Sequence, residues 1–185
     1  KLSQLVFRWL ISGSNAQELE TSLQLVAFEL TNEASVAGVL DDMEQLSSHL
    51  HVDALTYIQS GIGLDFARAA LFVLEAEQQG KSGVLNKYEL EHIAPNAATN
   101  QWRETLQLRG KDYTRKVNEL GNLLLLDKEL NRDVKQKPYL EKRMSYKDSN
   151  VLSARNLAAT YDDWGVAQID LRTKDLALRL MEFVS

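Results

Sequence analysis

The sequence predicts a mainly α-helical protein that carries one small sheet. Apolar residues recur at helical spacing through the first eighty residues and again toward the C-terminus. Only two segments, 84–93 and 122–126, have the length and flanks of strands. No apolar run approaches the length that crosses a bilayer, so we expect no membrane segment. The chain contains no cysteine, which excludes disulfides and thiolate metal sites and leaves oxygen and nitrogen as possible metal ligands.

Residues 1–83 are expected to form a helical connector or scaffold. Leu2, Leu5 and Trp9 lie on one helical face, and glycines provide stop signals. The expected helices run from Leu2 to Gly13, from an Asn15 cap to Leu30, from Val36 to Leu50, and from an Asp65 cap to Gly80. The small, polar segment 80–83 is the best domain boundary.

Residues 84–185 are expected to form a second domain. It begins with a strand, 84–93, that Pro95 ends, and a short buried strand follows at 122–126. The expected helices of this domain cover 102–108, 113–120, 127–144 with a break at Pro138, 152–159 and 171–184.

Charge is distributed unevenly along the chain, whose net charge is −5. Residues 1–80 hold three Lys or Arg and eleven Asp or Glu, whereas residues 81–185 hold eighteen basic and fifteen acidic residues. Seven basic residues fall between Lys128 and Lys147, against three acidic ones. This asymmetry indicates that the second half meets a polyanion, although a solvated basic helix face would produce the same pattern.

Four polar residues in the second half carry the chemistry: Glu91, His92, Asn122 and Asn131. Phosphodiester hydrolysis requires a deprotonated water, a cation that neutralises the transition state, and stabilisation of the leaving oxygen. An imidazole titrates near neutrality and can take the proton of the water. Carboxylate and carboxamide oxygens suit a hard cation that keeps positions open for water and phosphate.

These residues belong to an ordered set of motifs that resembles a known family. The set is Glu91-His-Ile-Ala-Pro95, Leu120-Gly-Asn-Leu-Leu-Leu-Leu126, Leu130-Asn131, Lys137-Pro-Tyr139, Lys142 and Tyr146. It resembles the HNH-type nuclease domain in the C-terminal part of GmrSD-type restriction enzymes. The resemblance covers roughly Leu71 to the C-terminus, with a weaker similarity at Phe7-Arg-Trp-Leu. It implies a helical bundle with an embedded ββα-metal finger.

The resemblance also implies a role for each matching residue. His92 is expected to be the general base, and Glu91 and Asn131 to bind Mg²⁺ or Mn²⁺. Asn122 is expected to hold the His92 loop through its carboxamide, and Lys142 to contact phosphate. Next to these, four basic residues are expected to contact the DNA backbone: Arg132, Lys135, Lys137 and Arg143.

The function expected from this set is a divalent-metal-dependent DNA endonuclease or nickase that restricts foreign or modified DNA in the cytoplasm. The chain shows no phosphate-cradling loop, because Gly61-Ile-Gly63 lacks a following lysine and a preceding strand. The resemblance implies that such enzymes carry an N-terminal nucleotide-binding sensor domain, so we expect this chain to be the nuclease end of a longer protein. One finger cuts one strand, so a double-strand break requires a dimer or repeated nicking.

Two alternatives remain open at this level. The chain could be an inactive helical interaction or regulatory module with a relic finger, in which the acidic first half docks the sensor domain. The site could also cut RNA, because the residue types do not distinguish the two nucleic acids.

Overall fold

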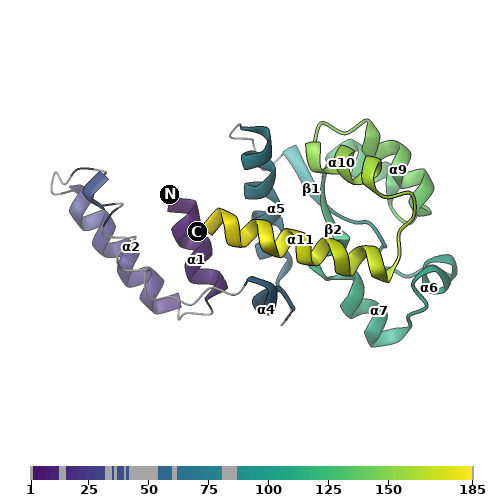
Figure 1. Ribbon diagram of the computed structural model, residues 1–185, viewed down its shortest axis with the longest axis horizontal. Coiled ribbons are helices and arrows are strands. Elements are labelled where there is room, and N and C mark those ends of the chain that lie inside the picture. The colour runs from purple at the N-terminus through teal and green to yellow at the C-terminus, as the bar shows by residue number, and fades with distance from the viewer. Residues whose placement is uncertain are drawn as a thin grey trace. The chain divides into compact units, whose positions relative to one another are not determined.

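The structure, a computed structural model, describes residues 2–12, 16–31, 35, 37–39, 41, 54–59, 62–80 and 87–184 (Figure 1). The chain divides into two compact units. One consists of Lys1–Tyr57 with Leu178–Ser185, and the other of Ile58–Ala177. The domain boundary expected at residue 83 lies outside the described residues.

The first unit is helical. Its described elements are α1 (Leu2–Ile11), α2 (Ala16–Thr31), most of the short helix α4 (Ala54–Gln59), and the C-terminal end of α11 (Val166–Val184). The rings of Phe7 and Phe183 meet edge to face at 6.1 Å, and Gln4 Nε2 donates to the Phe183 carbonyl at 2.8 Å. The Asn15 cap and most of the helix expected over 36–50 lie outside the described residues.

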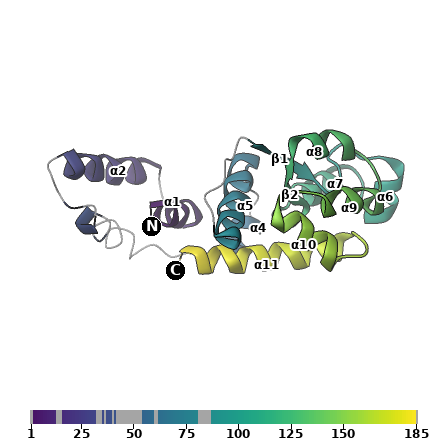
Figure 2. The same cartoon turned by 90° about the horizontal axis from the view of Figure 1, so that it is seen from above.

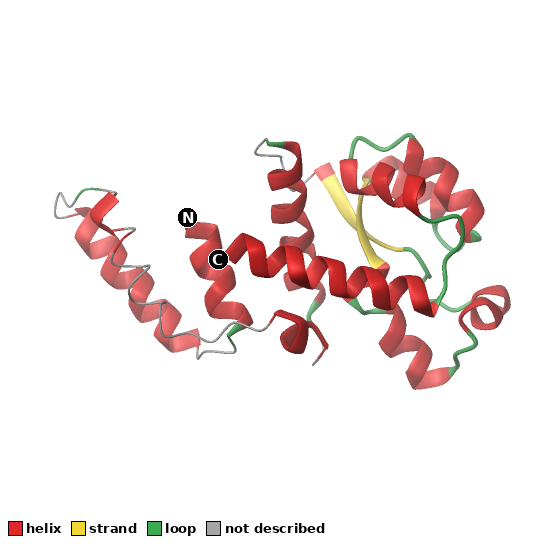
Figure 3. Ribbon diagram, viewed as in Figure 1, coloured by secondary structure: helices red, strands yellow, loops and turns green. Residues whose placement is uncertain are grey.

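The second unit is built on a two-stranded antiparallel sheet, drawn in yellow in Figure 3. Strand β1 (Tyr88–His92) pairs with β2 (Leu123–Asp127), so that Tyr88 lies opposite Asp127 and His92 opposite Leu123. All four leucines of β2, 123–126, are completely buried. A strand that is apolar on both faces needs cover on both faces.

Helices provide this cover (Figures 1 and 2). Around the sheet lie α5 (Leu64–Gln79), α8 (Lys128–Val134), α9 (Tyr139–Lys147) and α10 (Leu152–Thr160), and both α5 and α10 contact β2 and each other. Helix α8 follows β2 without a loop and contacts both strands. The prediction of a mainly helical chain with one small sheet is therefore confirmed.

The sequence predicted the C-terminal end of α5 correctly but not the residue that caps its N-terminus. Gly80 ends the helix in the left-handed conformation at φ 61°, as expected of a C-terminal glycine. The expected Asp65 cap is wrong, because Gly63 occupies the N-cap and Asp65 lies in the first turn. There its negative carboxylate still interacts favourably with the positive end of the helix dipole.

Two helices and a short 3₁₀ turn separate the strands. They are α6 (Asn100–Leu106), α7 (Gly110–Val117) and η2 (Leu120–Asn122). Tyr113 on α7 donates to the Pro95 carbonyl at 2.8 Å, and burial raises the pKa of this tyrosine to about 12. Trp102 on α6 donates to the carbonyls of Gln136 and Lys137. These contacts pin the loop after β1 and the loop after α8.

Helix α11 begins at Val166, five residues before the start expected from the sequence. Its first turns carry Ile169, Arg172 and Thr173, all buried, so tertiary contacts and not a continuous apolar stripe define this end. Among the described residues, no helix combines the length and the apolar character that crossing a membrane requires.

Candidate active site

His92 is the last residue of β1 and lies opposite Leu123, the first residue of β2. Its neighbour Ile93 continues the pairing by donating its backbone N–H to the Asn122 carbonyl at 3.0 Å. Ile93, Ala94 and Pro95 are buried, while the His92 side chain remains half-buried. The imidazole therefore projects from a rigid backbone and still reaches solvent.

Asn122 holds this backbone in place. Its Oδ1 accepts from the Ala94 N–H at 2.9 Å and from Trp164 Nε1 at 3.0 Å. Its Nδ2 donates to the Ala94 carbonyl at 2.8 Å and to the Val117 carbonyl at 2.7 Å. The side chain is fully buried, and four partners satisfy it completely. Asn122 thus ties the segment after His92 to the end of α7 and to Trp164.

Gly121 brings the same turn against α11. Its N–H donates to Thr173 Oγ1 at 3.1 Å. Arg172, buried on α11, donates to the carbonyls of Gly121 at 2.6 Å and Leu123 at 2.7 Å. A Cβ at position 121 would lie within 3.0 Å of three α11 atoms, so only glycine allows this approach.

The His92 ring is oriented by Asn118, which follows α7. Asn118 Nδ2 donates to the Thr114 carbonyl at 2.7 Å, and this bond turns Asn118 Oδ1 toward His92 Nε2, 3.1 Å away. A carboxamide oxygen only accepts, so Nε2 of a neutral His92 carries the proton and Nδ1 carries the lone pair. Among the described residues, no protein group is bonded to Nδ1.

The electrostatics of the site favour the neutral ring. Burial lowers the pKa of His92; the hydrogen bond to Asn118 opposes this shift, and the Lys142 ammonium adds to it. An imidazole with a lowered pKa is unprotonated at neutral pH. His92 can therefore accept a proton at Nδ1 while Asn118 holds the opposite side of the ring.

Glu91 takes part in a different network, which is buried. Its side chain accepts from Lys142 Nζ at 2.6 Å and from the Tyr146 hydroxyl at 2.9 Å. Lys142, with 0% exposure, also donates to the His92 carbonyl at 2.9 Å. Burial raises the pKa of Glu91, and the Lys142 ammonium opposes that shift. Lys142, expected at a phosphate, thus lies inside the fold and supports the backbone of His92.

Asn131, on α8, lies beside Glu89. Its Nδ2 donates to Glu89 Oε2 at 2.9 Å. Successive side chains of a strand point to opposite faces, so Glu89 and Glu91 share one face of β1 and His92 takes the other. No hydrogen bond joins Glu91 to Asn131 among the described residues.

The expected metal ligands therefore do not fit an ion in this arrangement. The one carboxylate of the pair, Glu91, is 5% exposed and already neutralised by an ammonium group. A cation there would have to displace Lys142, at the cost of a buried, unpaired charge. The described residues also contain no cluster of three or more His, Cys, Asp or Glu side chains suited to a metal.

The four basic side chains expected to contact DNA differ in exposure and in the bonds that they make within the protein. Arg132, Lys135 and Lys137 are exposed around the end of α8. Arg143 donates to the Ala158 carbonyl at 2.7 Å and pairs with Asp162 at 2.7 Å. Arg143 thus links α9 to α10 and to the turn after α10, and its guanidinium is already bonded within the protein.

Sequence reasoning assigned no role to several residues of this site. Tyr146 was named only as part of the motif set, although its i, i+4 spacing from Lys142 could have placed both on the face toward Glu91. Asn118 had no such signal, because its role depends on where α7 ends relative to β1. Trp164 and Arg172 are more than forty residues from the turn that they hold.

A half-buried histidine at the end of β1, with a neutral ring and a free lone pair at Nδ1 among the described residues, can act as a general base. The chain belongs to the family of GmrSD restriction endonucleases, C-terminal domain, whose model matches residues 17–178. Membership implies restriction-endonuclease-type function. The match begins well before Leu71, the start expected from the motifs, so nearly all of α2 lies within it, whereas α1 and the segment Phe7-Arg-Trp-Leu precede it. A comparison with curated proteins yields no match.

Proposed function

We propose that this chain hydrolyses phosphodiester bonds in DNA, as an endonuclease or nickase of the HNH, ββα-metal type, with His92 as general base. One observation supports the proposal most directly. The half-buried imidazole of His92 is held through Nε2 by Asn118, and its Nδ1 has no protein partner among the described residues.

His92 performs one proton transfer in this scheme. A water placed at Nδ1 loses a proton to the ring as its oxygen attacks phosphorus. The new P–O bond forms as the bond to the 3′ oxygen breaks, and the leaving oxygen takes a proton from solvent. Asn118 stabilises the resulting imidazolium, because its Oδ1 accepts from Nε2–H both before and after the transfer.

The remaining site residues support His92 and do not react. Asn122 holds the backbone at Ala94, and Lys142 bonds the carbonyl of His92 itself. A misplacement of about 1 Å in a catalytic group costs about 100-fold in rate. Both side chains therefore act as positioning residues of the proposed nuclease.

Mg²⁺ or Mn²⁺ belongs to the proposal because restriction endonucleases usually use divalent ions. Such an ion would offset charge on the transferred phosphate. Glu91 and Asn131 do not fit such an ion as they stand, and the proton transfer at His92 uses only residues of this chain. The proposal also includes restriction of foreign or modified DNA, an N-terminal nucleotide-binding sensor domain as partner, and two copies or repeated nicking for a double-strand break.

Nicking of supercoiled plasmid tests the proposal. Wild type is compared with His92→Ala and with Glu104→Ala, an exposed control on α6, at low salt with Mg²⁺, Mn²⁺ or a chelator. We expect wild type and Glu104→Ala to nick with a divalent ion, and His92→Ala to bind DNA but not cut. Equal cutting by His92→Ala would refute the assignment of the base.

The relic module predicts a different result. The buried pairing of Lys142 with Glu91 is the observation in its favour, because it leaves the expected metal ligand neutralised. Under this alternative, wild type neither nicks any nucleic acid nor binds Mn²⁺ in a calorimetric titration. Parallel assays on RNA separate a ribonuclease from both.

A further inference from the structure

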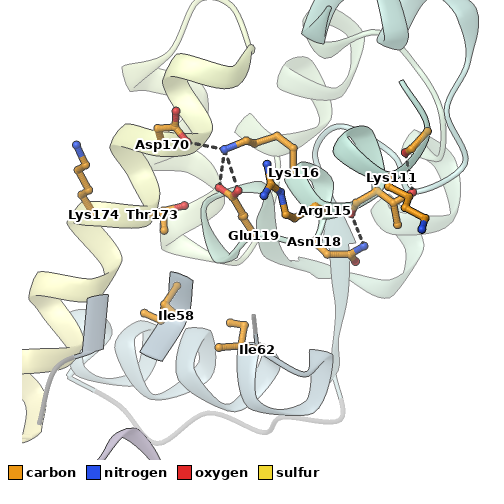
Figure 4. Close-up of a pocket in the computed structure, with 12 residues that line it drawn as sticks. Ile58, Ile62, Lys111, Arg115, Lys116, Asn118, Glu119, Asp170, Thr173 and Lys174 are labelled. Atoms are coloured by element: carbon orange, nitrogen blue, oxygen red, sulfur yellow. Dashed lines mark hydrogen bonds and ion pairs between the residues drawn. The ribbon is translucent and has the colours of Figure 1, made fainter. Parts of the chain in front are cut away.

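A hollow in the second unit lies beside Asn118, the residue that bonds the His92 ring. It has a volume of about 1090 Å³ and opens to solvent (Figure 4). Asn118, whose Oδ1 bonds His92 Nε2, forms part of its wall. The hollow, here called the α7–α11 pocket, is lined by Ile58, Ile62, Gly110, Lys111, Thr114, Arg115, Lys116, Asn118, Glu119, Asp170, Thr173 and Lys174.

The cations of this pocket fall into two groups. Lys116 pairs with Glu119 at 2.8 Å and with Asp170 at 2.7 Å, as the dashed lines of Figure 4 show. Burial lowers the pKa of Lys116, but these two carboxylates raise it by more. This group neutralises itself, and Lys116 links the end of α7 to α11.

The second group is free to meet an anion. Lys111 and Lys174 have no anionic partner among the described residues. Arg115 approaches Asp112 only at 3.9 Å, with both side chains more than 70% exposed, so that pair contributes little. Three of the four cations that line the open pocket are therefore available to an anion, and both of its carboxylates are paired with Lys116.

The position of the pocket relative to His92 suggests what it binds. Asn118 contacts the imidazole on its Nε2 side, so the pocket wall lies one ring away from the proposed proton acceptor at Nδ1. A DNA strand carries a negative charge at every nucleotide, and Lys and Arg provide the usual contacts to it. A strand cut at His92 can therefore place neighbouring phosphates at Lys111, Arg115 and Lys174.

We propose that the α7–α11 pocket binds the phosphate backbone of the DNA strand beside the bond that is cut. This inference rests on the proposed nuclease function and adds a binding surface distinct from the residues around α8. It makes Lys111, Arg115 and Lys174 positioning contacts, which carry no sequence information.

The test measures binding separately from cutting. A fluorescein-labelled duplex is titrated with the full chain carrying His92→Ala, and the slope of log K against log salt is obtained from anisotropy. The pocket variant adds Lys111→Gln and Lys174→Gln. The charge-matched control adds Lys87→Gln and Arg103→Gln, both exposed and outside the pocket.

We expect the pocket variant to lower the slope by about 2, about 1 for each lost phosphate contact. The control should change it by less than about half of one contact. Equal slopes for the pocket variant and its parent, or equal losses in pocket and control variants, overturn the proposal. Circular dichroism confirms that each variant is folded, and a variant that unfolds is replaced by the single changes.

Cutting by the proteins with intact His92 separates the two proposals. If wild type nicks DNA but the pocket variant keeps the salt-dependence slope of its parent, the proposed DNA-binding role of the pocket is refuted and the nuclease proposal is supported. If the slope falls as expected but wild type does not cut DNA, the nuclease proposal is refuted and the DNA-binding role of the pocket is supported. When both hold, the pocket variant should need more DNA to reach the wild-type nicking rate.

Discussion

Replacing Gly121 by alanine tests whether the turn before β2 is shaped by its contact with α11. The added Cβ would lie within 3.0 Å of three atoms of α11, one of them the Thr173 backbone nitrogen at 2.8 Å. Two of these atoms are backbone, so a side-chain rotation cannot relieve the overlap. The turn and α11 must separate, which costs about 1–3 kcal/mol as overpacking.

Separation also weakens hydrogen bonds that cross the same contact. Gly121 N–H bonds Thr173 Oγ1, and Arg172 bonds the Gly121 carbonyl. Each is worth about 1 kcal/mol. We therefore expect Gly121→Ala to lower the free energy of unfolding by about 4 kcal/mol, a large part of the roughly 5–15 kcal/mol typical of a domain.

Urea unfolding followed by tryptophan fluorescence measures this loss. Gly63→Ala is the matched control, because no atom lies within 4 Å of the Cβ that it adds. It should cost less than about 1 kcal/mol, as expected at a helix N-cap. A loss below about 1 kcal/mol for Gly121→Ala as well would refute the close approach to α11.

Three further predictions concern His92 and the network beneath it. Asn118→Leu keeps the side-chain bulk but removes the hydrogen bond that raises the pKa of His92. The nicking rate should therefore fall, and the acid limb of its pH–rate profile should move to lower pH. An acid limb that does not move would contradict the tautomer assigned to His92. Lys142→Met leaves Glu91 buried without its ammonium and should cost about 3–5 kcal/mol in urea unfolding at pH 7. That loss of stability should shrink as the pH falls through the raised pKa of Glu91, because the folded protein then binds a proton more tightly than the unfolded chain. Adding Glu91→Gln to Lys142→Met should restore stability at pH 7. A loss of stability that does not change with pH would count against the buried pair. Tyr146→Phe removes one buried hydrogen bond to Glu91 and should cost about 1 kcal/mol by the same measurement, with no change indicating that the hydroxyl is not bonded there.

Local patterns in the sequence accounted for much of the fold. The leucine run 123–126 predicted a buried strand, and the helices around it followed from apolar spacing and glycine stops. Boundaries were less accurate where distant contacts define them. Helix α11 starts five residues early because Ile169, Arg172 and Thr173 are buried against the rest of the unit, a fact that no local pattern contains.

For the candidate site as well, the sequence predicted some residues, and only the structure showed their partners. The residue types and their order singled out His92, Asn122 and Lys142, and all three lie around one stretch of backbone. Their partners could not be predicted, because spacing along the chain does not say which side chain meets which. The pairing of Asn131 with Glu89 instead of Glu91 is the clearest case.

By itself, the sequence determined the class of protein, because motifs in a particular order need no coordinates to be recognised. It also determined which histidine matters, since His92 alone of the three stands among those motifs. Only the tertiary structure decided that Glu91 is neutralised by Lys142, that Asn118 orients the imidazole, and that a basic pocket lies beside Asn118. These are facts of distance and burial between segments far apart in the chain, and packing alone brings such segments together.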